Sequence, residues 1–191
     1  MKWSMENFRE SDEMSEDSML GKWKSAPPYV KWPAAVIAGW LVLILLIQLM
    51  NSMSATLSMP TECDEDSMNC FRLAHDGTSY ASGDLVALKF NATLEEAQNV
   101  VETWFDEGLL SSVVSVEGEE MIVIHGVDHT EFWFFADDVF ISMECNENQV
   151  ELTLHSQSRL GKGDLGENLR RMTGFHADMT TVEWSGSACE G

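Results

Sequence analysis

The sequence predicts an α+β protein: a twisted antiparallel sheet of about five or six strands with two packing helices, preceded by one transmembrane helix. Three observations lead to this fold class. An apolar stretch near the N-terminus is long enough to cross a bilayer. An amphipathic helix follows it, and strand-like runs then come in quick succession with short, turn-rich separations. Such separations favour hairpins, and therefore an antiparallel meander.

The N-terminal segment, residues 1–31, is expected to be a cytoplasmic and mostly disordered tail. Residues 6–28 are polar and show no sustained apolar period, so they offer little surface to bury.

The apolar stretch PAAVIAGWLVLILLIQLM covers residues 33–50, and no charged residue occurs from Trp32 to Thr61. At ~1.5 Å per residue, a helix of this length just crosses a hydrocarbon core of roughly 30 Å. A cleaved signal peptide is the closest alternative, but it normally has a short leader and a small-residue cleavage site. Here 32 residues precede the run and the site that follows is poor. We therefore predict a retained transmembrane helix over residues 32–51.

The basic residues predict the orientation of this helix. Lys22, Lys24 and Lys31 precede it, and no basic residue follows it before Arg72. Basic residues concentrate on the cytoplasmic side, so we expect the N-terminus in the cytoplasm and the C-terminal domain outside.

The four cysteines all fall in the outer part of the chain, where the compartment is oxidising in most cells. Four thiols allow three pairings. We favour Cys63 with Cys70, which closes a short acidic loop, and Cys145 with Cys189, which holds the C-terminal tail. Asn91 begins the triplet Asn-Ala-Thr, a weak signal for N-glycosylation.

Residues 52–69 read as a polar linker, residues 70–176 as the α+β domain and residues 177–191 as a C-terminal tail. A first strand is expected over 84–90. The helix that follows, over 91–108, has a capping box made by Thr93 and Glu96. The remaining strand-like runs are 109–118, 119–127, 130–136, 137–145 and 148–156. The aromatic run in residues 131–140 is interpreted as a core strand.

The most specific motif is SQSRLGKGDLGENLRRM, residues 156–172. It resembles the closing motif of the "domain of unknown function 1499" family, in which Ser-x-Ser-Arg-x-Gly is followed by Asp-x-Gly-x-Asn and arginines. The matched positions are Ser156, Ser158, Arg159, Gly161, Asp164, Gly166, Asn168, Arg170 and Arg171. Members of that family are often membrane-anchored or exported. The resemblance implies an architecture rather than a reaction.

Most of the motif has a structural interpretation. Asp164 can cap a helix with Glu167 completing a capping box, and Leu165, Leu169 and Met172 are spaced to bury one side of that helix. Glu167 can also pair with Arg170 and Arg171 on the helix surface.

The functional interpretation rests on Arg159, which ends a strand on its polar face and has no partner of fixed spacing. Beside a glycine-rich turn and a helix N-terminus, it could help to bind an oxyanion. The candidate ligand-binding residues are Ser158, Arg159, Lys162, Asn168, Arg170 and Arg171. The alternative is that carboxylates of the domain itself occupy this position.

No catalytic residue is assigned. His155, Ser158 and Asp164 contain the groups of a hydrolytic triad, but strand alternation puts His155 and Ser158 on opposite faces. His125 and His129 have the spacing of metal ligands on a helix, yet they fall at a strand end and a turn, and we interpret them as surface or turn histidines. We expect no metal and no cofactor.

The formal net charge of −21 argues against nucleic acid as a partner. The prediction is a membrane-anchored extracytoplasmic binding or assembly module for a small anion or a protein partner. The alternatives are a hydrolytic or isomerising enzyme and a structural subunit of a membrane complex.

Overall fold

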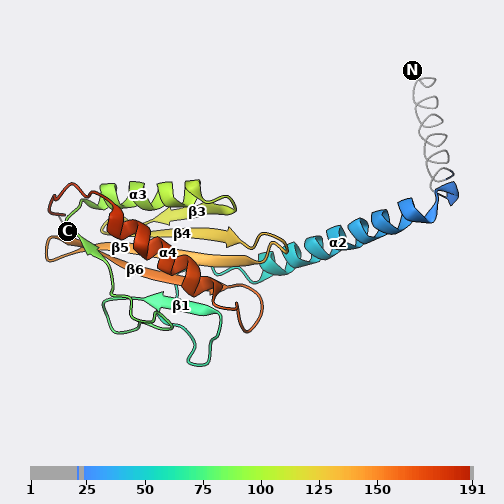
Figure 1. Ribbon diagram of the computed structural model, residues 1–191. Coiled ribbons are helices and arrows are strands. Elements are labelled where there is room, and N and C mark those ends of the chain that lie inside the picture. Colours follow the sequence, from blue (N-terminus) through green and yellow to red (C-terminus); the bar gives the residue numbers. More distant parts are fainter. Residues whose placement is uncertain (1–20, 22–23, 190–191) are drawn as a thin grey trace, which may run out of the picture. The chain divides into compact units, whose positions relative to one another are not determined.

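The structure is a computed structural model that describes residue 21 and residues 24–189 (Figure 1). The chain divides into two compact units, residues 1–46 and residues 47–191. The disorder expected for residues 6–28 falls mostly outside the described residues.

The apolar stretch forms the helix α2 (Pro28–Met53), which has 26 residues and a mean hydropathy of 2.3 over its most apolar window. Its length and composition are sufficient to cross a membrane. Pro33 lies early in the helix, where a missing backbone N–H breaks little of the hydrogen-bond ladder.

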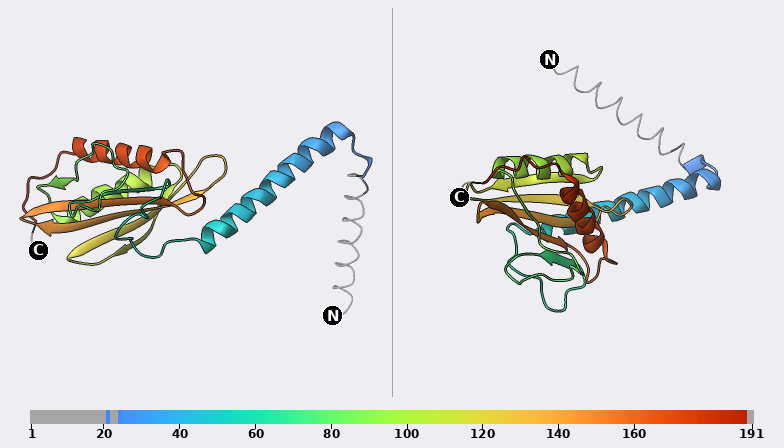
Figure 2. Two further views of the ribbon diagram at one scale, coloured as in Figure 1. Left: turned by 90° about the horizontal axis from the view of Figure 1, so that it is seen from below. Right: turned by 60° about the vertical axis from the view of Figure 1, so that its left-hand side comes forward.

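The second unit is built on a six-stranded antiparallel sheet with two helices on one face (Figures 1 and 2). The strand order is β1-β6-β5-β4-β3, and the short β2 also pairs with β6. The strands are β1 (Cys70–Leu73), β2 (Lys89–Phe90), β3 (Ser111–Glu117), β4 (Met121–His129), β5 (Ala136–Asn146) and β6 (Gln149–Ser158). The helices are α3 (Leu94–Glu107) and α4 (Glu167–Thr181). The predicted fold class is confirmed.

The core lies between the sheet and the two helices. Val150, Leu152 and Leu154 alternate along β6 and are fully buried on this face, as the period of two predicts. Phe105 of α3 packs against Gly126 of β4, where an added Cβ would lie 2.2 Å from the Phe105 ring. Glycine at this position lets the helix approach the sheet closely.

Two predicted strands are corrected. The strand expected over 84–90 is reduced to β2, because a turn from Ser82 to Leu85 interrupts its beginning. Residues 130–135 of the run predicted over 130–136 form a hairpin loop, because β4 and β5 pair without interruption up to His129 and Ala136. The aromatic residues of this loop are consequently exposed rather than buried in the core as expected: Phe132, Trp133 and Phe135.

The structure contains two disulfides, and both have the favoured pairing. Cys63 is joined to Cys70 with a Cα–Cα distance of 6.0 Å, and Cys145 to Cys189 with 5.8 Å. The second bond attaches the segment that follows α4 to the strand β5.

Candidate functional site

In the motif between β6 and α4, Asp164 caps the start of α4 as predicted, but Glu167 does not complete a capping box. The Asp164 carboxylate accepts hydrogen bonds from the backbone N–H groups of Gly166 (2.9 Å) and Asn168 (2.7 Å), as a cap should. The Glu167 carboxylate instead pairs with Arg170. The reason is that α4 starts at Glu167 with Gly166 as its N-cap, so Glu167 is too early in the helix to complete the box.

The buried side of α4 also differs from the predicted one. Met172 is buried as expected, but Leu165 is fully exposed and Leu169 is 40% exposed. Asn168 and Arg171 face the sheet in their place and are buried. The buried side of α4 therefore carries polar residues from the motif.

Arg171 holds a buried polar cluster between α4 and the sheet. Its guanidinium donates to Asp137 Oδ2 (2.7 Å), to Asn168 Oδ1 (2.9 Å) and to Ser156 Oγ (3.2 Å), and it also pairs with Asp128. Burial alone would lower the pKa of Arg171, but the neighbouring carboxylates of Asp137 and Asp128 hold it above its usual value. The cluster fixes α4 against β4, β5 and β6 through one side chain.

Arg159 holds a second cluster on the opposite face of the sheet. Its Nε and Nη2 donate to the two carboxylate oxygens of Asp138, at 3.0 and 2.6 Å. His125 Nε2 lies 2.7 Å from the same carboxylate, and the Thr56 N–H donates to it at 2.9 Å. Although burial would raise the pKa of Asp138, these hydrogen bonds lower it to about 2.

The candidate ligand-binding residues are thus divided between the two faces. Asn168 donates to Ser158 Oγ (3.1 Å) and to the Asn69 carbonyl on the α4 face, whereas Arg159 points to the other face. Lys162 and Arg170 are exposed. The structure does not bring Arg159 together with Arg171. Anion binding by this set stays a prediction, as does glycosylation of the exposed Asn91, whose side-chain oxygen accepts from Gln149.

The aspartates that hold the two arginines were missed in the sequence. Asp137 and Asp138 are consecutive in β5, so their side chains leave the strand on opposite faces. Two adjacent acids inside a predicted buried strand are a detectable signal, because unpaired carboxylates are rarely buried.

The interpretation of His125 as a surface or turn residue is wrong. His125 lies in the middle of β4, is buried, and stacks on Phe140 with ring centroids 4.2 Å apart. The strand extends to His129, beyond its predicted end, which moves His125 into the sheet. His129 is half-buried at the end of the strand.

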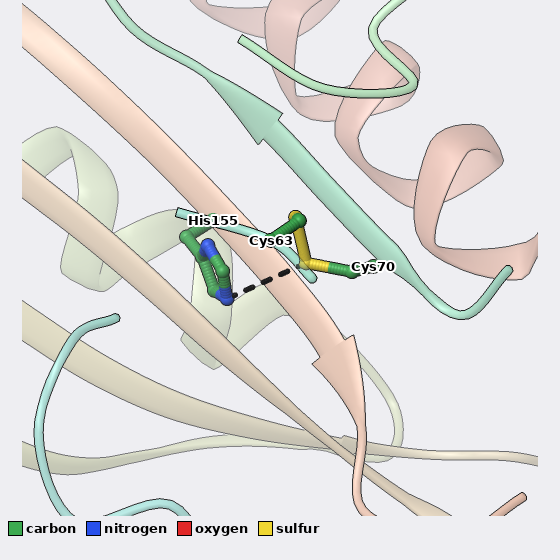
Figure 3. A group of neighbouring side chains, drawn as sticks. All are labelled: Cys63, Cys70 and His155. Atoms are coloured by element: carbon green, nitrogen blue, oxygen red, sulfur yellow. Dashed lines mark hydrogen bonds between the residues drawn. A yellow bond between two sulfur atoms is a disulfide. The ribbon is translucent and has the colours of Figure 1, made fainter. Parts of the chain in front are cut away.

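His155 lies beside the disulfide Cys63–Cys70 (Figure 3). Its Nε2 is 3.7 Å from Cys70 Sγ and 2.9 Å from Gln157 Oε1, while its buried Nδ1 has no hydrogen-bond partner among the described residues. Burial lowers the pKa of His155, which favours the neutral ring. Within the described part of the chain, this is the group of side chains with metal-ligand spacing, but both sulfurs are committed to the disulfide.

A groove with a volume of about 820 Å³ opens beside the start of α4. Its wall combines the end of α3 and the following loop, the end of β4, and the motif segment from Asp164 to Arg171. Leu109 and Leu165 stand at its rim with side chains that are almost or fully exposed. Five carboxylates and two arginines also line it: Asp128, Glu131, Asp164, Glu167, Asp178, Arg170 and Arg171.

Comparison with known proteins agrees with the resemblance seen in the motif. Residues 61–179 match the sequence model of a family described as "Protein of unknown function (DUF1499)". No curated protein and no solved structure matches the chain. The matched region contains all six strands, α3 and the motif that starts α4, and it makes up more than half of the chain. The chain therefore belongs to the DUF1499 family.

Proposed function

We propose that the chain is a single-pass membrane protein whose C-terminal domain lies outside the cytoplasm and binds a protein partner without chemical turnover. The length and hydropathy of α2 support the anchor. The two disulfides support an oxidising compartment for the domain. The lysines before the helix support an N-terminus in the cytoplasm.

The observation that carries the binding proposal is the presentation of Leu165. Its φ of 57° lies in the left-handed region, which costs a residue with a side chain roughly 1–2 kcal/mol. Its apolar side chain is nevertheless fully exposed at the rim of the groove. The Asp164 carboxylate, one residue before Leu165, accepts hydrogen bonds from the N–H groups of Gly166 and Asn168, which follow it, and these bonds hold the conformation of Leu165. Strained backbone that displays an apolar side chain supports contact with a partner.

The lining of the groove suggests the chemistry of that partner. Leu109 and Leu165 provide apolar contacts at the rim, and Trp104 lies in the wall. The carboxylates outnumber the arginines, and the Trp104 indole N–H donates to Asp178. A segment with an apolar side chain flanked by basic residues would be complementary to this lining.

A protein partner is favoured over a small anion because the two arginines with little exposed surface, Arg159 and Arg171, already bind carboxylates. Arg159 forms two hydrogen bonds with the Asp138 carboxylate, and Arg171 forms ion pairs with both Asp137 and Asp128. An incoming anion would have to displace a buried carboxylate or rely on the exposed Lys162 and Arg170.

The test is affinity capture of the full chain from native membranes, with the variants Leu109→Asp and Leu165→Asp. We expect each variant to lose most of a partner that the wild type retains, since a charge replaces an apolar contact in the groove. Val86→Asp is the matched control, because Val86 is 75% exposed and does not line the groove. Equal recovery of the same partners by all four proteins would contradict a binding role for the groove.

A further inference from the structure

The hairpin loop between β4 and β5 presents three aromatic side chains to the outside. Phe132 is 60% exposed, Trp133 38% and Phe135 37%. The rings of Phe132 and Trp133 meet edge to face, with centroids 4.7 Å apart. A soluble loop usually carries polar residues, so this exposure calls for a covering environment.

The loop is rigidly built. The Thr130 N–H donates to the Phe135 carbonyl, and the Phe135 N–H donates to Thr130 Oγ1, both at 3.0 Å. Phe134 adopts a left-handed φ of 55°, and its N–H donates to the Thr130 carbonyl. The aromatic side chains are thereby displayed by a defined backbone.

The end of α2 is hydrogen-bonded to this loop. The side-chain amides of Gln48 and Asn51 both donate to the Phe134 carbonyl, at 2.9 and 2.8 Å, and the Ala136 N–H donates to Asn51 Oδ1. All of these residues belong to the second unit of the chain. Asn51 is only 2% exposed. The polar groups at the end of the apolar helix are therefore satisfied by the loop.

If α2 crosses the membrane as proposed, these bonds place the loop at the depth at which the helix leaves the apolar core of the bilayer. Gln48 lies inside the apolar run, and Leu49, Met50 and Met53 remain exposed around it. A polar side chain at this depth needs an internal partner, and Phe134 supplies one. The aromatic loop is thus joined through Phe134 to helical turns that also expose apolar side chains.

We propose that Phe132, Trp133 and Phe135 insert into the interfacial region of the lipid bilayer beside α2 and hold the domain against the membrane surface. This inference rests on the proposed membrane anchor. Amphipathic aromatic rings favour the headgroup level. Strong acidity makes electrostatic attraction to anionic lipids implausible for this domain, so the contact depends on apolar insertion and should occur on zwitterionic lipid.

The test uses the full chain in phosphatidylcholine vesicles with a nitroxide label on an introduced cysteine, since the four native cysteines are in disulfides. Glu131→Cys reports on the loop and keeps all three aromatic residues. Glu119→Cys is the matched control, because it lies in the hairpin at the other end of β4. Val42→Cys reports on the helix.

We expect a collision ratio of oxygen to a water-soluble nickel chelate that is roughly tenfold higher at position 131 than at position 119, because the polar chelate is excluded from the apolar phase. Replacing the three aromatic residues by serine should lower the ratio at 131 towards that at 119. Equal ratios at the two positions, with a high ratio at position 42, would overturn the insertion alone. A water-exposed position 42 would overturn the membrane anchor as well. Protection of position 131 in native membranes but not in lipid vesicles would assign the loop to a protein and also overturn the proposal.

Discussion

At the residue scale, two arginines of the motif, Arg159 and Arg171, form ion pairs with two neighbouring acids of β5. Asp137 and Asp138 leave β5 on opposite faces, and each meets one arginine that arrives from elsewhere in the chain. The arginine guanidinium suits this role because its planar fork matches a carboxylate in two hydrogen bonds. The arginines that stand out in this acidic sequence therefore serve to pair with buried carboxylates of the same domain.

The first prediction concerns Arg159. Arg159→Gln should lower the free energy of unfolding by about 3 kcal/mol, because Asp138 then remains buried without its cationic partner. Thermal melts of the full chain in a mild detergent measure this loss. The exposed Lys162→Gln is the control and should change stability by less than about 0.5 kcal/mol.

The same melts test the predicted anion site. If the candidate ligand-binding residues around Arg159 bind sulfate or phosphate, these anions should raise the melting temperature of the wild type by mass action. The melting temperature of Arg159→Gln should then rise much less. Chloride at equal ionic strength serves as the reference. An equal response of both proteins would leave the cluster with a structural role only.

The second prediction concerns acid. The folded pKa of Asp138 is about 2, below its ordinary value of 3.8. A depressed carboxyl pKa stabilises the folded state fully above about pH 4, and this contribution, of about 2 kcal/mol, is lost as the pH falls towards 2. Asp138→Asn should be less stable at pH 7 and should show a shallower loss between pH 4 and pH 2. Parallel pH profiles of the two proteins, measured by urea unfolding, would show that Asp138 is not the group responsible.

At the scale of elements, the helices are held to the sheet by two different means. α4 adds the buried hydrogen bonds of Arg171 and Asn168 to the apolar packing of Met172, Phe175 and Met179, whereas α3 depends on close apolar packing, as at Gly126. Dense packing of this kind tolerates no added volume.

The third prediction compares the same substitution at two glycines. Gly126→Ala should destabilise the domain by about 2–3 kcal/mol, because the new methyl group would overlap the Phe105 ring. Gly174→Ala should stabilise it by about 0.5–1 kcal/mol, since Gly174 lies inside α4 with open space around it and alanine favours the helix. Chemical denaturation gives both values. A neutral Gly126→Ala would mean that α3 can move away from the sheet at little cost.

At the scale of the whole molecule, the chain combines an apolar helix with an acidic, disulfide-bonded domain. The positions of the lysines, of the cysteines and of the aromatic loop are three separate observations, and each supports the proposal of a domain outside the cytoplasm and next to the bilayer.

The fourth prediction concerns topology. Protease added to intact cells or spheroplasts should digest the C-terminal domain and spare roughly the first 30 residues, because positive charges retain that end in the cytoplasm. Tags at the two ends, read by immunoblot, distinguish the products, and permeabilised cells should lose both tags. Digestion of the N-terminal tag alone would reverse the orientation and remove the reason to expect disulfides in the domain.

The sequence by itself determined the features that depend on local pattern and spacing. The length of the apolar run predicted α2, the helical period predicted α3, and the short turn-rich separations predicted the antiparallel pairing of β3 to β6, whereas β1 was not predicted. The family followed from nine positions of one motif. The favoured cysteine pairing also agrees with the structure, because one bond closes a short loop and the other restrains the chain end.

Only the tertiary structure decided what the conspicuous side chains contact. Arg159 meets Asp138 because β5 and β6 pair in the register that sets Asp138 opposite Gln157, and no pattern within either strand contains that information. Leu165 is exposed because α4 begins only at Glu167, so Leu165 lies in the turn before the helix and not on its buried side. The aromatic run reads as a strand by composition, yet pairing of the segments on either side makes it a loop. The contact of Arg159 and the loop position of the aromatic run both depend on long-range strand pairing, which local propensity does not encode.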